Sequence, residues 1–193
     1  MFSVADCDGD LPPIGRKQLA AGVFIYGPQT SLLLRVSDEV VGFGLAPDGQ
    51  FQRLDWQIAF PPKTSEFAIN ASNAAFWPEP IKRYIDTLSH GARARQSGMR
   101  WNGSLVADAM RIFRRGGVFL YPQDSRDGYE AGRLRLVYEA SPIAFLIEAA
   151  GGLATTGTID ILDHPISSLH QRVPLFFGSA DEVRTILEHH HQS

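Results

Sequence analysis

The chain has 193 residues, of which 44% are hydrophobic and 20% charged, and its formal net charge is −3. This length and composition predict one globular domain, and the slightly acidic balance excludes a broad polycationic surface for nucleic acid. The start MFSVADCDGD has neither a basic nor an apolar run, and no stretch of 18 apolar residues occurs, so we expect a cytoplasmic protein without a membrane span.

The first third of the chain is typical of an antiparallel meander. Residues 31–36, SLLLRV, and 39–54, EVVGFGLAPDGQFQRL, are short β-rich runs that the turn sequences SDE and PDG interrupt. Within a single domain spanning 1–193, residues 1–14 are the one segment that a linker would fit.

Helices and strands alternate in the rest of the chain. SEFAIN predicts a strand, PEPIKRYIDTLS a helix, GSLVADAMRIFRRGG a second helix that ends on glycine, and GVFLYP a buried strand. RLRLVYE predicts a further strand, followed by a helix with Ser141 as N-cap and Pro142 at its first position. GLATTG and VPLFFGS predict the last strands, and Ser179 with Glu182 predicts a capping box for the final helix. The fold class is therefore mixed α/β.

Polar side chains at the ends of these strands are the candidates for a binding site, because ligands of α/β folds gather at the carboxyl ends of strands. Asn70, Tyr121 and Glu139 lie at such ends or just after them, and Arg100 lies in a loop before a helix.

The strand predicted at 133–139 carries the most specific chemistry. Alternation places Arg133 and Arg135 on one face and two leucines on the other, with Glu139 at the end. Guanidinium groups match phosphate oxygens with paired donors, whereas a carboxylate tolerates a phosphate only with a cation between them. The pattern suggests a phosphorylated ligand near a divalent metal. The alternative is a solvated strand face on which Glu139 only offsets Arg135.

Several longer motifs then reveal a family resemblance. GGVFLYP, GRLRLVYEASPIAFLIEAAGG, ATTG and LHQRVPLFFGS, preceded by LAAGVFIYGPQTSLLL, FAINASN and RWNGSLVADAMRIFRRGG, resemble the carboxyl-terminal half of class I fructose-1,6-bisphosphatases. The resemblance covers nearly the whole chain. It implies a layered α/β/α sandwich with a mixed sheet, the carboxyl-terminal domain of the sugar-phosphatase fold.

The resemblance also implies roles for individual positions. Glu139 matches a metal-ligand carboxylate, and Arg100 matches the arginine that reaches the neighbouring subunit's site. The other implied contacts of the sugar and its 6-phosphate are Asn70, Asn73, Trp101, Gly103, Ser104, Leu105, Tyr121, Arg133 and Arg135. Trp101 and Asn73 stand where many members have tyrosine, and Arg133 stands where many have lysine, which keeps the charge but changes the donor geometry.

The parent enzyme that the resemblance implies uses magnesium or manganese to hydrolyse fructose 1,6-bisphosphate to fructose 6-phosphate and phosphate, in gluconeogenesis or the Calvin cycle. The family's DPLDGSSN motif, with its aspartate metal ligands, lies in an amino-terminal half that these 193 residues do not include. We therefore expect a substrate-binding half that is inactive alone, with the amino-terminal half as partner and a homotetramer as the complete enzyme. The alternatives are a sedoheptulose-1,7-bisphosphatase, a dual-specificity relative, or a non-catalytic sugar-phosphate-binding module.

Overall fold

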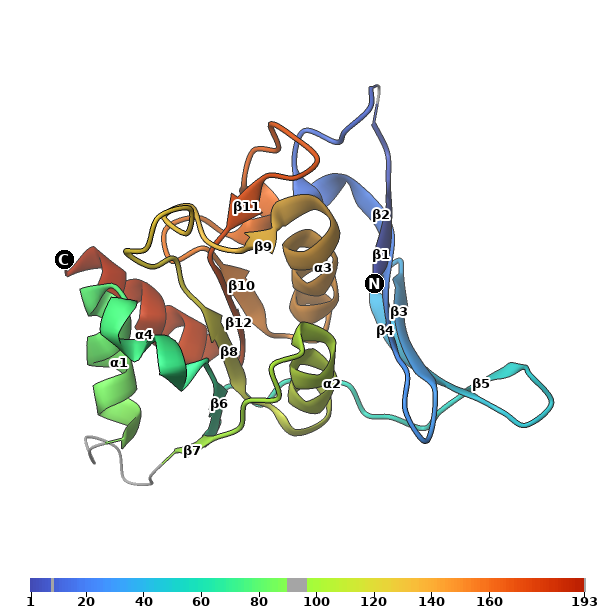
Figure 1. The fold of residues 1–193 in the computed structure, drawn as a ribbon. Coiled ribbons are helices and arrows are strands. Elements are labelled where there is room, and N and C mark those ends of the chain that lie inside the picture. The colour runs from blue at the N-terminus through green and yellow to red at the C-terminus, as the bar shows by residue number, and fades with distance from the viewer. Residues whose placement is uncertain (8, 90–96, 193) are drawn as a thin grey trace.

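The structure is a computed structural model that describes residues 1–7, 9–89 and 97–192. Its elements stack in layers, which Figure 1 shows from right to left: an antiparallel sheet, the helices α2 (Leu105–Arg115) and α3 (Ser141–Ala149), a mixed sheet, and the helices α1 (Glu79–Ser89) and α4 (Ala180–His191). The mixed sheet between two helical layers confirms the predicted α/β/α sandwich. The antiparallel sheet is an additional outer layer.

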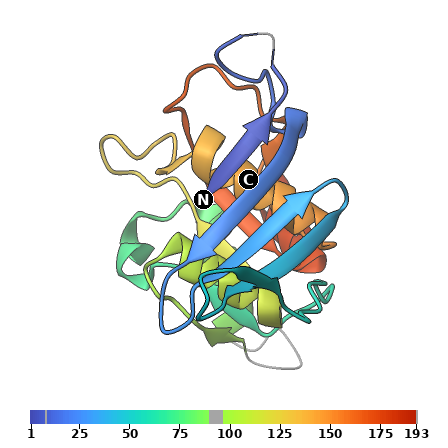
Figure 2. The same ribbon diagram turned by 90° about the vertical axis from the view of Figure 1, so that its right-hand side faces the viewer.

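The antiparallel sheet is the meander that the turn sequences predict. It follows chain order, with β1 (Phe2–Ala5), β2 (Gln18–Ile25), β3 (Ser31–Val36), β4 (Glu39–Leu45) and β5 (Phe51–Arg53). Strand β1 lies within the segment considered as a linker and pairs with β2. The helices cover one face of this sheet, and its other face is open to the viewer in Figure 2.

The mixed sheet has the order β10 (Leu153–Thr155), β12 (Leu175–Gly178), β8 (Val118–Tyr121), β6 (Glu66–Ala68) and β7 (Gly98–Met99). Strand β6 pairs in parallel with both β7 and β8, whereas β12 pairs antiparallel with β10 and β8. The carboxyl ends of β6, β7 and β8 therefore meet at one edge of the sheet.

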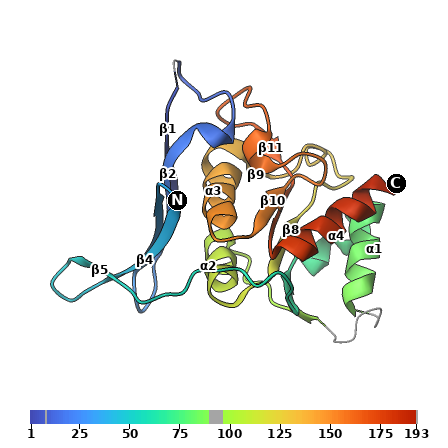
Figure 3. The ribbon, with the colours of Figure 1, turned by 180° about the vertical axis from the view of Figure 1, so that it is seen from behind.

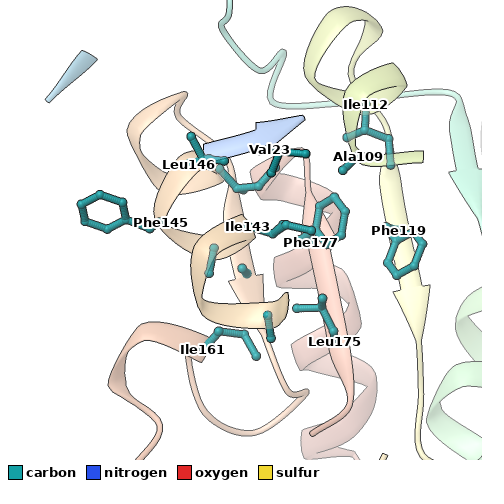
Figure 4. Packing of buried hydrophobic residues seen from close by; sticks show 14 of the residues in the cluster. Val23, Ala109, Ile112, Phe119, Ile143, Phe145, Leu146, Ile161, Leu175 and Phe177 are labelled. Carbon is teal, nitrogen blue, oxygen red and sulfur yellow. The ribbon is translucent and has the colours of Figure 1, made fainter. Parts of the chain in front are cut away.

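Alternate residues of the mixed sheet supply two hydrophobic clusters. Phe119 of β8 and Phe177 of β12 stack at 4.9 Å between ring centroids and face α2 and α3, where they join Val23 of the outer sheet in one core (Figure 4). Val118 and Leu120 of β8 face the opposite way, toward α1 and α4, which lie against each other (Figure 3). Alternate side chains of the strands thus pack against the helical layers on both faces of the mixed sheet.

The strand predicted at 133–139 is wrong beyond Arg135. Among the described strands, β9 (Leu134–Arg135) pairs with β11 (Arg172–Val173) alone, and Leu136–Ala140 form a π-helix (η3) that continues into α3. The N–H of Ser141 bonds to the carbonyl of Leu136, so Ser141 lies inside a helical run and is no N-cap. A capped helix start was predicted where the backbone is already helical.

The predicted capping box of α4 is also wrong. The Ser179 side chain makes no cap hydrogen bond, and a carboxylate oxygen of Glu182 accepts the Tyr84 hydroxyl proton at 2.8 Å instead. This contact ties α4 to α1. The remaining short elements are η1 (Gly15–Lys17), η2 (Ala71–Phe76) and η4 (Ile161–Asp163). Among the described residues, none of the helices combines the length and apolar character needed to cross a bilayer.

The Phe119–Phe177 stack predicts that removal of one of its rings strongly destabilises the domain. Phe177 is fully buried, so Phe177→Ala should lower the free energy of unfolding by about 3–5 kcal/mol. Leu169→Ala, at a side chain that is 47% exposed, should change it by less than about 0.5 kcal/mol. Urea unfolding monitored by circular dichroism measures both. If the two variants lost the same free energy of unfolding, the stack would not be what joins the layers.

Candidate functional site

The shared edge of β6, β7 and β8 collects several of the predicted site residues. Asn70 follows β6, Arg100 and Trp101 follow β7, and Tyr121 is the last residue of β8. The strands are parallel, so these positions emerge at the same edge. A small pocket opens there, lined by Ile69, Asn70, Asn73, Trp77, Leu120, Tyr121, Pro122 and Asp124.

Asn70 shapes the wall of this pocket. Its side-chain oxygen caps η2 by accepting from the backbone N–H of Ser72 at 3.2 Å and from the Ser72 hydroxyl at 2.5 Å. Its amide nitrogen donates to none of the described residues, so both N–H groups are available to a ligand. The backbone N–H of Asn73 bonds to the Asn70 carbonyl at 3.1 Å, which holds the two asparagines together.

Trp101 adds an aromatic wall beside Tyr121. The indole stacks on Phe119 at 5.8 Å and lies 6.0 Å from the Tyr121 ring, measured between centroids. Gly103 follows with φ of 75°, a left-handed backbone that glycine adopts without strain. Ser104 then caps α2 by accepting the Ala107 N–H at 3.4 Å, so the predicted residues from Trp101 to Leu105 form the approach to a helix amino terminus.

A buried ionic network fixes this approach, and the sequence analysis did not identify it. Asp108 is fully buried and accepts from the Asn102 backbone N–H at 3.1 Å and its side chain at 3.2 Å. Arg111 donates to Asp108 at 3.3 Å, to Glu66 of β6 at 2.8 Å and to the Arg100 carbonyl at 3.0 Å. The loop is thereby tied to both α2 and β6. Helical spacing of Asp108 and Arg111 was the only sequence signal.

Arg133 lies over aromatic rings. Its guanidinium carbon is 4.1 Å from the Tyr129 ring centroid and 5.9 Å from that of Tyr121. No described residue accepts a hydrogen bond from the half-buried Arg133 side chain or forms an ion pair with it. Its donors are therefore available to an anion beside the pocket.

Arg135 and Glu139 form a separate pair. One Glu139 carboxylate oxygen accepts the Arg135 backbone N–H at 2.7 Å and lies 3.8 Å from the Arg135 guanidinium. The two groups thus interact directly, as the solvated-face alternative assumed. Arg172 of β11 lies directly opposite Arg135 and was not identified from the sequence. This arrangement leaves an excess of positive charge along β9 and β11.

The carboxylate of Glu139 fits one ligand of a divalent cation, because one oxygen remains outside its bond to the Arg135 N–H. Within the described residues, no group of three or more histidine, cysteine, aspartate or glutamate side chains is placed to hold a metal. The described residues therefore fit a metal site to which this chain contributes Glu139 as one of several ligands.

Arg100 is exposed and lies apart from the pocket contacts. Its backbone N–H donates to the Phe67 carbonyl at 2.7 Å, and its guanidinium donates to the Met99 carbonyl at 3.1 Å. It forms no ion pair with a carboxylate of the described ranges. The side chain is thus an exposed cation on a fixed backbone.

Asp124 is a further pocket residue that sequence reasoning missed. Its carboxylate is buried and accepts the Arg126 backbone N–H and Nε, each at 3.0 Å, while a second oxygen pairs with Arg126 Nη2. The Arg126 hydrogen bonds lower the pKa of Asp124 against the opposing effect of burial. Its position three residues after β8 was the available signal.

The lowered pKa predicts how stability depends on pH. A carboxyl whose pKa is lower in the folded state stabilises the fold above its unfolded pKa, near 3.9, and loses this contribution as the pH falls further. Asp124→Asn should therefore be less stable than the unaltered chain at pH 6, with a difference that shrinks below about pH 4. Urea unfolding at each pH measures this. Asp127→Asn, at an exposed site in the same loop, is the control. If the stability of Asp124→Asn varied with pH in the same way as that of the unaltered chain, the stabilising role of the Asp124 carboxylate would be contradicted.

Comparison with known proteins places this geometry in a family. A family model described as the fructose-1,6-bisphosphatase C-terminal domain matches residues 60–191. The class 1 fructose-1,6-bisphosphatase of Acidiphilium cryptum is 52% identical over 178 residues, 90% of this chain and 50% of that protein. The corresponding protein of Rhodopseudomonas palustris strain HaA2 is 48% identical over 197 residues, 98% of this chain and 57% of that protein.

A solved structure agrees. The crystal structure of Leishmania major fructose-1,6-bisphosphatase in holo form superposes with a TM-score of 0.88 at 37% identity, over 92% of this chain and 58% of that one. The chain spans about half the length of the curated relatives it matches. The predicted resemblance and fold are thereby confirmed, and the chain belongs to the class 1 fructose-1,6-bisphosphatase family, of which it carries the carboxyl-terminal domain.

Proposed function

We propose that this chain is the sugar-phosphate-binding half of a cytoplasmic fructose-1,6-bisphosphatase, which hydrolyses the 1-phosphate of fructose 1,6-bisphosphate to give fructose 6-phosphate and phosphate. The observation that carries the proposal is Arg133. It is a half-buried guanidinium that lies over Tyr129 and Tyr121, and it forms no ion pair or side-chain hydrogen bond with the described residues, although its charge contributes to the lowered pKa of Asp124. Such a group favours a bound phosphate.

The groups around Tyr121, the pocket residue whose ring lies 5.9 Å from the Arg133 guanidinium, suit the 6-phosphate end of the sugar. The Asn70 amide, the Tyr121 hydroxyl and the Trp101 indole are hydrogen-bond donors, as phosphate oxygens require. Asn73 lines the same pocket and adds a further amide. Backbone N–H groups from Gly103 to Leu105, at the start of α2, would meet the sugar hydroxyls, because the first N–H groups of a helix have no intrahelical partner.

Glu139 would serve the other end of the substrate as one ligand of magnesium or manganese. Arg135, which the resemblance implies as a contact of the sugar and its 6-phosphate, would also orient Glu139 through its backbone N–H and balance its charge. When bound, the metal would lower the pKa of the attacking water and neutralise negative charge on the transferred phosphoryl group and on the departing sugar oxygen. We propose that the remaining metal ligands come from the amino-terminal half of the family, outside these 193 residues.

The open face of the antiparallel sheet is the proposed docking surface for that half. Its cross-strand rows are apolar, since Phe2, Gly22, Leu34 and Val41 are neighbours in register on β1 to β4. The described helices that contact this sheet, α2 and α3, pack on its other face (Figure 2). An apolar sheet face of this extent favours burial against a partner. In the complete enzyme, a homotetramer, Arg100 would reach the site of the neighbouring subunit.

The half-enzyme proposal predicts binding without turnover. The 193-residue chain should bind fructose 6-phosphate in a nuclear magnetic resonance titration but release no phosphate from fructose 1,6-bisphosphate with magnesium, since it supplies one metal ligand. Addition of the separately produced amino-terminal half of a relative should restore phosphate release. Sedoheptulose 1,7-bisphosphate, assayed in parallel, tests the alternative substrate. Turnover by the chain alone would contradict the proposal, and binding without restoration would favour a non-catalytic module.

The two ends of the substrate should separate in mutants. Arg133→Gln should raise the dissociation constant of fructose 6-phosphate about 10-fold or more, because it removes charged hydrogen bonds to phosphate. Glu139→Gln should leave that constant within about twofold while lowering kcat of the reconstituted enzyme by at least 10- to 100-fold. Unchanged kcat in Glu139→Gln would mean that Glu139 serves only as the partner of Arg135.

A further inference from the structure

The loop between β8 and β9, residues 122–133, connects two of the proposed phosphate contacts. It starts after Tyr121 and ends at Arg133. Its far end is fixed by Gly132, whose φ is 85° and at which a Cβ would lie 2.2 Å from the Val173 backbone. No other residue fits that close approach to β11. The loop therefore has a fixed end at the base of Arg133.

Two arginines of this loop lie over one ring. The guanidinium carbon of Arg133 is 4.1 Å from the Tyr129 ring centroid, and that of Arg126 is 5.1 Å from it. Arg126 also lies 4.6 Å from the Phe76 ring of η2. Each arginine is attracted to the negative ring face, although the two positive charges repel each other.

Asp124 offsets that repulsion. It accepts Arg126 Nε at 3.0 Å and pairs with Arg126 Nη2, so one of the two positive charges is neutralised. The backbone closes the same unit, because Asp124 N donates to the Tyr129 carbonyl at 3.2 Å and Tyr129 N donates to the Arg126 carbonyl at 3.1 Å. Arg133 remains as the cation whose donors are not used by the described chain. Tyr129 is its nearest aromatic neighbour.

We infer that Tyr129 is a positioning residue for phosphate binding, in that its ring, held by the Asp124–Arg126 pair, orients the Arg133 guanidinium toward the pocket at the end of β8. The inference rests on the proposed function of Arg133. An arginine side chain has several rotatable bonds, so a ring that fixes it before binding reduces the entropy lost when phosphate binds. The ring of Tyr129 supplies this, and its hydroxyl is not required.

The test compares Tyr129→Leu with Tyr129→Phe in the 193-residue chain. Tyr129→Leu should raise the dissociation constant of fructose 6-phosphate by about 3- to 10-fold, and Tyr129→Phe, which keeps the ring, should stay within about twofold. Nuclear magnetic resonance titration gives the constants. Thermal unfolding checks that Tyr129→Leu folds, as expected for a half-buried loop residue.

A double-mutant cycle shows whether Tyr129 acts through Arg133. In an Arg133→Gln background, Tyr129→Leu should have no further effect on fructose 6-phosphate binding. If Arg133→Gln weakens binding but Tyr129→Leu does not, or if the two effects simply add, the positioning role is wrong while the proposed function stands. If Arg133→Gln leaves binding unchanged, or the unaltered chain does not bind, the proposed function itself fails and the positioning role with it.

Discussion

The parallel pairing of β6 with both β7 and β8 is the constraint on which the candidate site depends. It directs three chain segments out of the same edge of the sheet, so Asn70, Trp101 and Tyr121 become neighbours although they are distant in sequence. The pairing is held by the core beneath it, where Phe119 stacks on Phe177 and the aromatic row continues to Tyr121 at the surface. Strand β8 thus contributes both to the core, through Phe119, and to the site, through Tyr121.

Charge is distributed over this edge unevenly. Asp108, Glu66 and Asp124 are each matched by an arginine, and these pairs fix loops rather than bind ligands. Removing charges from water is costly, so buried carboxylates need such partners. Arg133 differs from the arginines of these pairs, because aromatic rings hold it in place of an ion-paired carboxylate. A cation held by rings keeps its donors for an anion, whereas a salt-bridged one would first have to release its partner.

The sequence predicted the elements whose signal is local. β-Rich runs between turn sequences predicted the meander, a short apolar run predicted β8, and helical spacing predicted α1 and α2. The alternation placed Leu134 and Leu136 on the face opposite the arginines, and both side chains enter the core, although the backbone after Arg135 is π-helical and not extended. The capping box failed because Glu182 bonds to Tyr84, which lies 98 residues away in sequence. Asp108 and Asp124 were missed for a related reason, because an isolated aspartate gives no sequence signal for the partner that buries it.

The π-helix, which replaces the strand predicted after Arg135, determines where the Glu139 carboxylate lies. In an extended strand, residues four apart are separated by about 13 Å, so Glu139 would lie far from the Arg135 backbone. In the π-helical turn its carboxylate accepts that N–H at 2.7 Å, which satisfies a donor that β9 leaves unpaired and fixes the direction of the carboxylate. π-Helical turns are rare and often occur at functional sites.

Because the turn runs directly into α3, whose residues 143, 144, 146 and 147 are fully buried, the position of Glu139 is set by the same core that sets β8. The two ends of the proposed substrate site, Arg133 beside Tyr121 and Glu139 in the π-helix before α3, are therefore placed relative to each other by packing.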